Sequence, residues 1–320
     1  MKNRIVTIVS MIFLAVLCLG GCGNTELEER NFPLAAAVTL TKENYQMAFG
    51  FEQLKAAADE KSEKENTSVL LAEGKDCMEL FLHADGENPG EMDYNHLKAL
   101  ILNRSLLEDE KRLGAFLGYL EEENLFSRNT LLFVTEDEPD QVMEMDTVLK
   151  EPVGTYLNER IASDERFKDS EAVTLGSLFR IWENENENLW IPYINCAEDK
   201  MILEKYYLMQ GRMAAGKVDR ETGELALLSG DEKLEDLHTD SQDENALMEV
   251  EAEIEQTLEE KMDAMTEKLQ QNQNADGTNS YYKLGAYARD IYLQFQKDWS
   301  GYRKNLTVEY HWDVTLVTSP

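Results

Sequence analysis

Cysteine is scarce in this chain of 320 residues, which excludes a scaffold held together by many disulfides. Of its four cysteines, Cys18 and Cys22 lie at the start of the chain. Nothing in the sequence indicates that the other two, Cys77 and Cys196, lie near each other. We predict that these two are buried free thiols; a single bridge between them is the alternative.

Basic residues are also few. The chain has 31 lysines and arginines against 63 aspartates and glutamates, so its formal charge is −32. A field of this sign repels nucleic-acid phosphates and anionic lipid head groups. Nucleic-acid binding is therefore not expected, and any attachment to a membrane must come from something other than a basic patch.

Motifs of catalysis and metal binding are missing. The sequence has no HExxH, no glycine-rich phosphate loop, no G-x-S-x-G and no CxxC. The polar alternation 183–188 lacks the glycine of a calcium loop and is predicted to be a solvated loop. We predict that the protein is not an enzyme and has no cofactor or metal. None of the four histidines has a partner at metal-ligand spacing; they are His83, His96, His238 and His311.

One histidine has an acidic neighbour on the same strand face. His311 and Asp313 alternate in a strand-like segment, where they could act as a base and the group that orients it. Alternate residues on an exposed strand face lie together by default, so we do not assign catalysis to this pair.

Long hydrophobic runs are missing as well, and the one apolar run at the start is shorter than the roughly 20 residues of a membrane span. Lys2 and Arg4 precede this run, Ile5–Leu19, which is followed by Gly20-Gly21 and Cys22. This order is typical of a lipoprotein signal peptide, residues 1–21, with acyl chains attached to Cys22 as the mature N-terminus. We therefore expect the mature chain at an extracytoplasmic membrane face. A soluble secreted protein and an uncleaved anchor are the alternatives.

The first two thirds of the chain alternate between strand and helix patterns. Strand-like segments 32–40 and 45–51 flank a polar turn, which predicts a β-hairpin. Apolar residues in 97–102, at helical spacing in 113–120, and in 131–134 predict a β-α-β unit with parallel strands. Cys77 lies in another strand-like run. Further helices are predicted over 139–145, 152–161 and 174–182.

The last third is predicted to contain a second hairpin, two helices and a terminal strand. The hairpin joins 203–213 to 225–228 through a turn at 219–223. A capping box, Ser241–Glu244, opens a long helix whose apolar positions extend from Leu247 to Leu269. Its apolar face is expected to pack on the core; a partner-binding face is the alternative. A second helix is expected over 281–299 and a half-buried strand over 306–317.

Several short motifs, in order along the chain, resemble the Ger(x)C spore germination lipoproteins, the C subunits of GerA-type nutrient germinant receptors. Gly21-Cys22 followed by 26–30 is similar to the family's lipidated start, and the histidine-led strand 94–102 to one of its central strands. Similar matches are found at 128–135, 190–192, 210–214, 276–277, 281–299 and the terminal strand. The chain departs from the family at Gly23, in 38–40, and in the short acidic region 229–243.

The resemblance implies a mixed α/β (α+β) lipoprotein with several small sheets, each packed with helices, and no transmembrane helix in the mature chain. Its N-terminal region would be 22–200 and its C-terminal region 201–320. It implies a non-catalytic subunit, anchored through Cys22 to the spore inner membrane, that assembles with integral membrane A- and B-type subunits. The alternative is an extracytoplasmic lipoprotein that binds a solute for a transporter; such proteins usually have two similar lobes, and the sequence shows no internal repeat.

Overall fold

A computed structural model describes residues 30–51, 69–88, 90–163, 173–184, 186–219, 244–270, 280–312 and 314. The predicted signal peptide, Cys22 and Ser241 of the predicted capping box lie outside these residues. In the described part of the chain, no helix is both long enough and apolar enough to cross a membrane.

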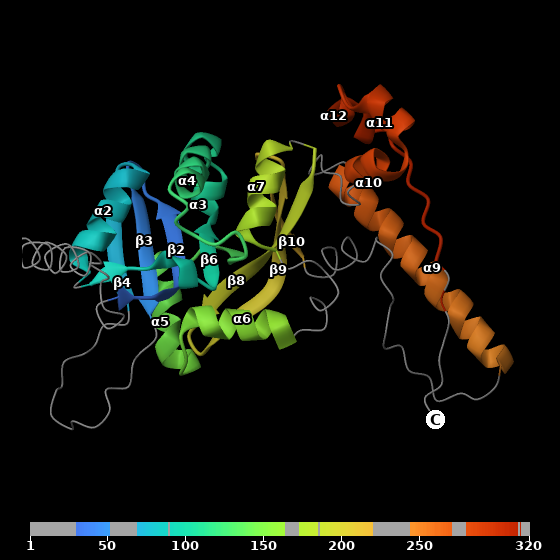
Figure 1. The fold of residues 1–320 in the computed structure, drawn as a ribbon. Coiled ribbons are helices and arrows are strands. Elements are labelled where there is room, and N and C mark those ends of the chain that lie inside the picture. Colours follow the sequence, from blue (N-terminus) through green and yellow to red (C-terminus); the bar gives the residue numbers. More distant parts are fainter. Residues whose placement is uncertain are drawn as a thin grey trace, which may run out of the picture.

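The centre of the fold is an eight-stranded mixed sheet with the order β10-β9-β8-β7-β6-β2-β3-β4 (Figure 1). Strands β2, β6, β7 and β8 are parallel, and the outer pairs are antiparallel. A two-stranded ribbon pairs β1 (Arg30–Asn31) with β5 (Glu91–Met92). The strands of the large sheet are β2 (Pro33–Leu40), β3 (Tyr45–Phe51), β4 (Val69–Gly74), β6 (Ala99–Asn103), β7 (Leu131–Thr135), β8 (Asn188–Ala197), β9 (Lys200–Gln210) and β10 (Met213–Asp219).

The first hairpin and the β-α-β unit were predicted and are confirmed. β2 and β3 pair across the polar turn, where the Thr41 hydroxyl donates to the Asn44 carbonyl at 3.1 Å. β6 and β7 run parallel. Both are buried along their whole length, because helices cover both faces of this part of the sheet. The intervening helix α4 (Glu110–Glu122) is capped by the Asp109 carboxylate, which accepts from the Arg112 amide at 2.9 Å.

Helices form a layer on each face of the sheet. One layer contains α2 (Cys77–Glu87), α4 and α7 (Leu175–Glu183), with the short α3 (Arg104–Leu107) preceding α4. The other contains α5 (Pro139–Leu149) and α6 (Val153–Ser163). The predicted helices 139–145, 152–161 and 174–182 are thus confirmed, and Thr174 forms a capping box with Ser177.

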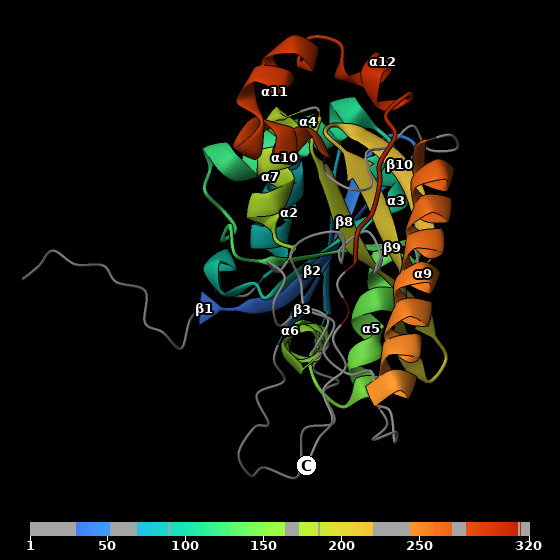
Figure 2. The same ribbon diagram turned by 90° about the vertical axis from the view of Figure 1, so that its right-hand side faces the viewer.

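The long helix α9 (Glu244–Lys268) continues the second layer over the last three strands. Figure 2 shows α7 and α9 on opposite sides of β8, β9 and β10. Met262, Met265 and Leu269 are buried against a cluster that includes Trp190 and Leu208. The predicted apolar face therefore packs on the core in this part of the helix.

The expected mixture of helices and sheets is confirmed, but the strands are not divided among several small sheets. β8 lies parallel to β7, with Val134 opposite Tyr193, and this pairing joins β8–β10 to the strands before them. No pattern of neighbouring residues indicates this long-range pairing.

Two local predictions in this part of the chain were wrong. The run around Cys77 is helix α2, because the Asp76 side chain accepts from the Glu79 amide and caps a helix at this point. The predicted strand 203–213 is not continuous, because the chain turns at Gly211-Arg212 and β9 pairs with β10. Residues 220–223 of the predicted turn lie outside the described ranges, so that turn stays a prediction. Gly211 has φ of 53°, a conformation that glycine adopts without strain. Residues 225–228 lie outside the described part.

The predicted helix 281–299 is three short helices, α10 (Ser280–Tyr287), α11 (Arg289–Phe295) and α12 (Trp299–Arg303). The helical path breaks at Ala288, where φ is −136° and ψ is 56°. Residues 306–312 form no strand; instead Tyr310 and Trp312 pack against the cluster beneath α9. Their alternation shows that one face is covered, but a helix covers it instead of a neighbouring strand.

Candidate functional site

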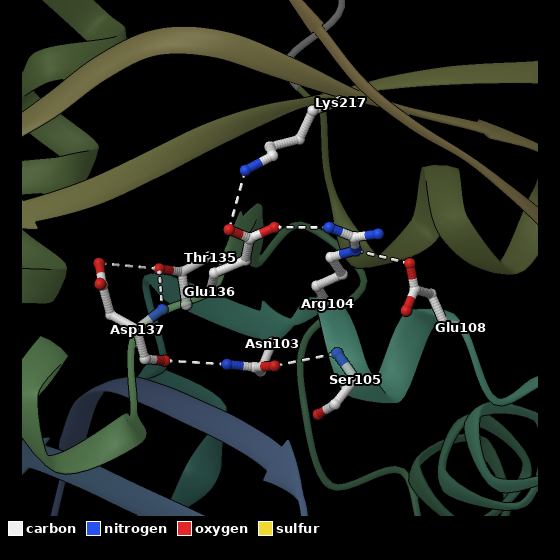
Figure 3. Close-up of polar contacts among 8 residues, drawn as sticks. All are labelled: Asn103, Arg104, Ser105, Glu108, Thr135, Glu136, Asp137 and Lys217. Carbon is white, nitrogen blue, oxygen red and sulfur yellow. Dashed lines mark hydrogen bonds and ion pairs between the residues drawn. The ribbon is translucent and has the colours of Figure 1, made fainter.

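Polar side chains gather where the parallel strands β6 and β7 end. Asn103 and Thr135 are the last residues of these strands and lie directly opposite each other. Arg104 opens α3, and Glu136 and Asp137 follow β7 (Figure 3). The carboxyl edge of a parallel sheet is the usual position of a ligand site in α/β proteins, so this cluster is the first candidate.

The uncharged part of the cluster ties three strand ends together. The Asn103 side chain accepts from the Ser105 amide and donates to the Asp137 carbonyl, both at 2.9 Å (Figure 3). The Ser105 hydroxyl in turn accepts from the Leu40 amide at 3.0 Å, at the end of β2. These bonds satisfy polar groups that would otherwise be left unpaired at the sheet edge.

Asp137 extends the connection to β8. Its Oδ2 accepts from the Thr135 hydroxyl at 3.2 Å and from the backbone amide of Cys196 at 2.7 Å. One carboxylate thus joins the end of β7 to a residue near the end of β8.

The ionic part is centred on Glu136. One carboxylate oxygen accepts from Arg104 Nη1 and the other from Lys217 Nζ, each at 2.8 Å. Lys217 comes from β10 and also lies 5.0 Å from the centre of the Tyr193 ring. The hydrogen bonds from Lys217 and Arg104 lower the pKa of Glu136, and the bond to Glu136 raises the pKa of Lys217.

This arrangement favours a rigid connection over proton transfer. Glu136 is held in its ionised form, which is the opposite of what a general acid requires. The nearby thiol is also unreactive, because burial and then Asp137 raise the pKa of Cys196 to about 12. We interpret the cluster as a structural tie among the strand ends.

Replacing Glu136 with glutamine is expected to lower stability modestly and in a pH-dependent way. Because the pKa of Glu136 is lower in the folded state, its ion pairs stabilise the protein above the ordinary carboxyl pKa and are lost as the pH falls through the folded value. The side chain is 38% exposed, so the loss at pH 7 should be at most about 1 kcal/mol. Urea unfolding measured between pH 7 and pH 3 should show the difference from the parent shrinking below about pH 4.

The exposed Glu122 at the end of α4 provides the control for that change. Glu122→Gln should leave the free energy of unfolding within about 0.5 kcal/mol of the parent at every pH. A constant deficit of Glu136→Gln down to pH 3 would contradict the ionic role of Glu136.

The cysteines agree with the prediction of free thiols. Cys77 is buried and Cys196 is partly buried, and neither forms a disulfide. Burial raises the pKa of Cys77 to about 11. The lipidation proposed for Cys22 lies outside the described residues and stays a prediction.

The histidines that the structure describes make unrelated contacts. His83 Nδ1 lies 2.6 Å from the Glu73 carbonyl oxygen, and His96 packs edge-on against Phe32. His311 is 85% exposed on its side chain. His238 and Asp313 are outside the described ranges, within which no group of three potential metal ligands occurs.

The segment 183–188 differs from the predicted solvated loop. Glu187 is only 5% exposed and binds Arg180 and the side chain of Asn184. The ion pair with Arg180 makes this burial tolerable, because a buried carboxylate needs a partner.

Sequence reasoning did not identify Arg104, Glu136 or Lys217. Two similar polar triplets, Asn103-Arg104-Ser105 and Thr135-Glu136-Asp137, follow the two buried strands and would have indicated the shared edge. Lys217 had no such sign, since it is 81 residues from Glu136 and reaches it only through the sheet.

Comparison with known proteins gives the family. Residues 23–195 match the family model described as "Spore germination protein N-terminal domain", and residues 226–319 match "Spore germination B3/ GerAC like, C-terminal". No curated protein matches the chain.

A solved structure, "Crystal Structure of the GerBC protein", has the same fold. It is 12% identical, with a TM-score of 0.51 over 84% of this chain and 93% of that one. The sheet continues through Asp219, between the two matched regions. The chain therefore belongs to the GerAC-like family of spore germination proteins.

Proposed function

We propose that this protein is a lipid-anchored, non-catalytic subunit of a spore nutrient germinant receptor. The observation that carries the proposal is the pair of family matches, which together cover most of the chain and begin one residue after Cys22. In this proposal the lipid on Cys22 holds the protein at the extracytoplasmic face of the spore inner membrane, where it assembles with integral membrane A- and B-type subunits.

The start of the described fold is consistent with a short tether. Seven residues separate Cys22 from Arg30, so the eight steps of the chain between them can span at most about 28 Å. Arg30 lies 3.5 Å from Asp93 and 3.9 Å from Glu91, which anchors β1 beside β5. A lipidated Cys22 would therefore keep this ribbon close to the bilayer.

In this proposal the lipid acts by confining the protein to the membrane surface, which requires no catalysis. A protein held within a few nanometres of a membrane meets membrane-bound partners at a high effective concentration. Because the formal charge of −32 opposes binding to anionic head groups, the lipid would supply attachment that the protein surface does not.

Germination of spores that carry Cys22→Ala tests the proposal. We expect the loss of refractility on nutrient addition to fall to the level of spores that lack the gene, for the same nutrients only. Cys18→Ala, in the predicted signal peptide, is the matched control and should germinate normally. Mass spectrometry of the N-terminal peptide should find acyl chains in the parent and in Cys18→Ala but not in Cys22→Ala.

Normal germination of both the deletion and the Cys22→Ala spores, in a strain without a redundant paralogue, would overturn the proposal. Calorimetric binding of a transported solute would then favour the solute-binding lipoprotein.

A further inference from the structure

One edge of the large sheet is open. β4 is the last strand at the end of the sheet opposite β10, and within the described ranges β3 is its only strand partner (Figure 1). Its pairing with β3 is regular, from Tyr45 opposite Gly74 to Gly50 opposite Val69. The outer side of such a strand presents amides and carbonyls to which another strand can add.

The opposite edge carries features that hinder strand addition, and β4 does not. In β10 the register shifts between Ala214 and Gly216, where Gly216 has φ of 108°, and Lys217 follows. Bulges and lysines are two of the devices that protect sheet edges from other strands. β4 contains neither proline nor lysine, and its register with β3 has no shift. Of the two edges, β4 is therefore the one suited to accept a further strand.

A side chain from α2 shows which backbone groups of β4 point outward. The Glu73 carbonyl accepts from Nδ1 of His83 at 2.6 Å, so it points to the open edge and not to β3. Residues two apart in a strand direct their amide and carbonyl to the same side, so Val69 and Leu71 present theirs to the open edge as well. Within the described ranges, no hydrogen bond occupies the outward groups of Leu71.

A groove of about 530 Å³ lies along this edge on the α5 side of the sheet. Its apolar part is Leu71, which is 53% exposed. Four exposed carboxylates also line it: Glu73 of β4, Glu87 at the end of α2, and Glu138 and Asp140 at the start of α5. Among the described residues, none of the four has a lysine or arginine partner. Carboxylates gathered in this way favour a partner of opposite charge.

We infer that β4 accepts an extended segment of a partner protein that carries lysine or arginine at alternate positions. The segment would pair with the outward groups of Val69 and Leu71, a mode of recognition called β-augmentation. Its alternate side chains would all lie on the α5 side. There their apolar stems would cover Leu71 and their charged ends would reach the carboxylates.

A second copy of this chain fits the edge less well, because its own β4 would bring further carboxylates to the same groove. The inference depends neither on lipid at Cys22 nor on the assignment to a receptor.

Fluorescence anisotropy of a labelled peptide tests this edge, with the full chain in detergent at physiological salt. The probe is a peptide of about eight residues in which lysine alternates with valine, the length of an ordinary strand. One comparison peptide has glutamate in place of lysine. The other keeps the lysines but is N-methylated at alternate residues, which removes the amides that pairing requires. We expect both comparison peptides to bind at least about tenfold more weakly than the probe.

Leu71→Pro removes the outward amide of β4 and leaves its pairing with β3 in place, because proline is tolerated where an edge amide faces solvent. It should weaken binding of the probe at least about tenfold. Leu71→Thr keeps this amide and is the matched control, with binding within about threefold of the parent. Urea unfolding of both variants shows whether the fold is retained.

A second pair of variants leaves the strand unchanged. Glu87→Gln combined with Glu138→Gln should weaken the probe about fivefold. Glu138 makes no side-chain cap to α5 and Glu87 is exposed, so the fold should be unaffected. Glu122→Gln combined with Glu159→Gln, at exposed positions of α4 and α6, is the matched control and should bind like the parent.

Hydrogen exchange in the parent decides the case if Leu71→Pro does not fold. Addition of the probe should slow exchange of the Leu71 amide, and unchanged exchange would overturn the proposal. Failure of the parent to bind the probe, or equal binding by a folded Leu71→Pro protein, would also overturn it. Equal binding of the N-methylated peptide would show attraction by charge alone. A dimer of the parent that Leu71→Pro abolishes would assign the edge to a second copy, contrary to the proposal.

Discussion

Gly154→Ala is expected to lower the free energy of unfolding by about 3 kcal/mol, the upper end of the range for overpacked sites. Gly154 lies in the first turn of α6, where a Cβ atom would come 2.0 Å from the Leu34 carbonyl oxygen and 2.5 Å from its carbon. Both atoms belong to the backbone of β2, which is paired on both sides and cannot yield as a side chain would. The same oxygen accepts from the Lys98 amide at 2.9 Å, so moving it would also strain this hydrogen bond.

Gly118→Ala is the matched control, because it makes the same change within a helix. Gly118 lies on the exposed side of α4, and a Cβ atom there would have nothing within 4 Å. Alanine should stabilise this helix by about 0.5–1 kcal/mol. Urea unfolding followed by circular dichroism should therefore shift in opposite directions for the two variants; a Gly154→Ala protein as stable as the parent would show that α6 does not pack on β2 at this distance.

Phe81→Ala is expected to destabilise the protein by about 3–5 kcal/mol, the cost of removing a large aromatic side chain from a packed core. Phe81 is 3% exposed on α2 and joins an aromatic cluster between this helix, the sheet and α4. The centres of four rings lie between 5.5 and 6.5 Å from its own; these are Phe49, Tyr94, Tyr119 and Phe126. Aromatic pairs at such distances contribute beyond their buried area.

The neighbouring residue on α2 is the control for this prediction. Leu82 is 66% exposed, and Leu82→Ala should change the free energy of unfolding by no more than about 0.5 kcal/mol. Near-ultraviolet circular dichroism at a fixed urea concentration would report the aromatic packing directly. Similar effects of the two changes would mean that α2 does not present Phe81 to the core.

Local pattern was enough to predict the first hairpin, the β-α-β unit and the helices that became α5, α6 and α7, but it did not predict β4 or β8. The hairpin at Thr41–Asn44 and the helix around Phe116 were recognised because period-two and helical spacing are properties of neighbouring residues. The error at Cys77 has the same origin: its short apolar run fits a strand or a buried helix, and the cap at Asp76 decided between them.

The C-terminal part was harder to predict because its pattern depends on distant partners. The alternation that includes Tyr310 and Trp312 correctly indicated a covered side, but the cover is α9 and not a strand. The predicted helix ending near Trp299 has apolar residues at helical spacing, yet Ile291 is 47% exposed and the helix breaks before it. Helical spacing records which residues share a face only as long as the helix continues.

The sequence by itself determined the mixed α/β class, the resemblance to the germination family, and the lipoprotein pattern ending at Cys22. Each depends on residue types in a short window or on motifs in a fixed order. Only the tertiary structure decided that β8 joins β7 in one sheet, that Lys217 reaches Glu136, and that β4 lies at an edge of that sheet. The reason is physical: strand register and the burial of polar groups are set by chain segments that meet only after folding, and no local pattern specifies which segments those are.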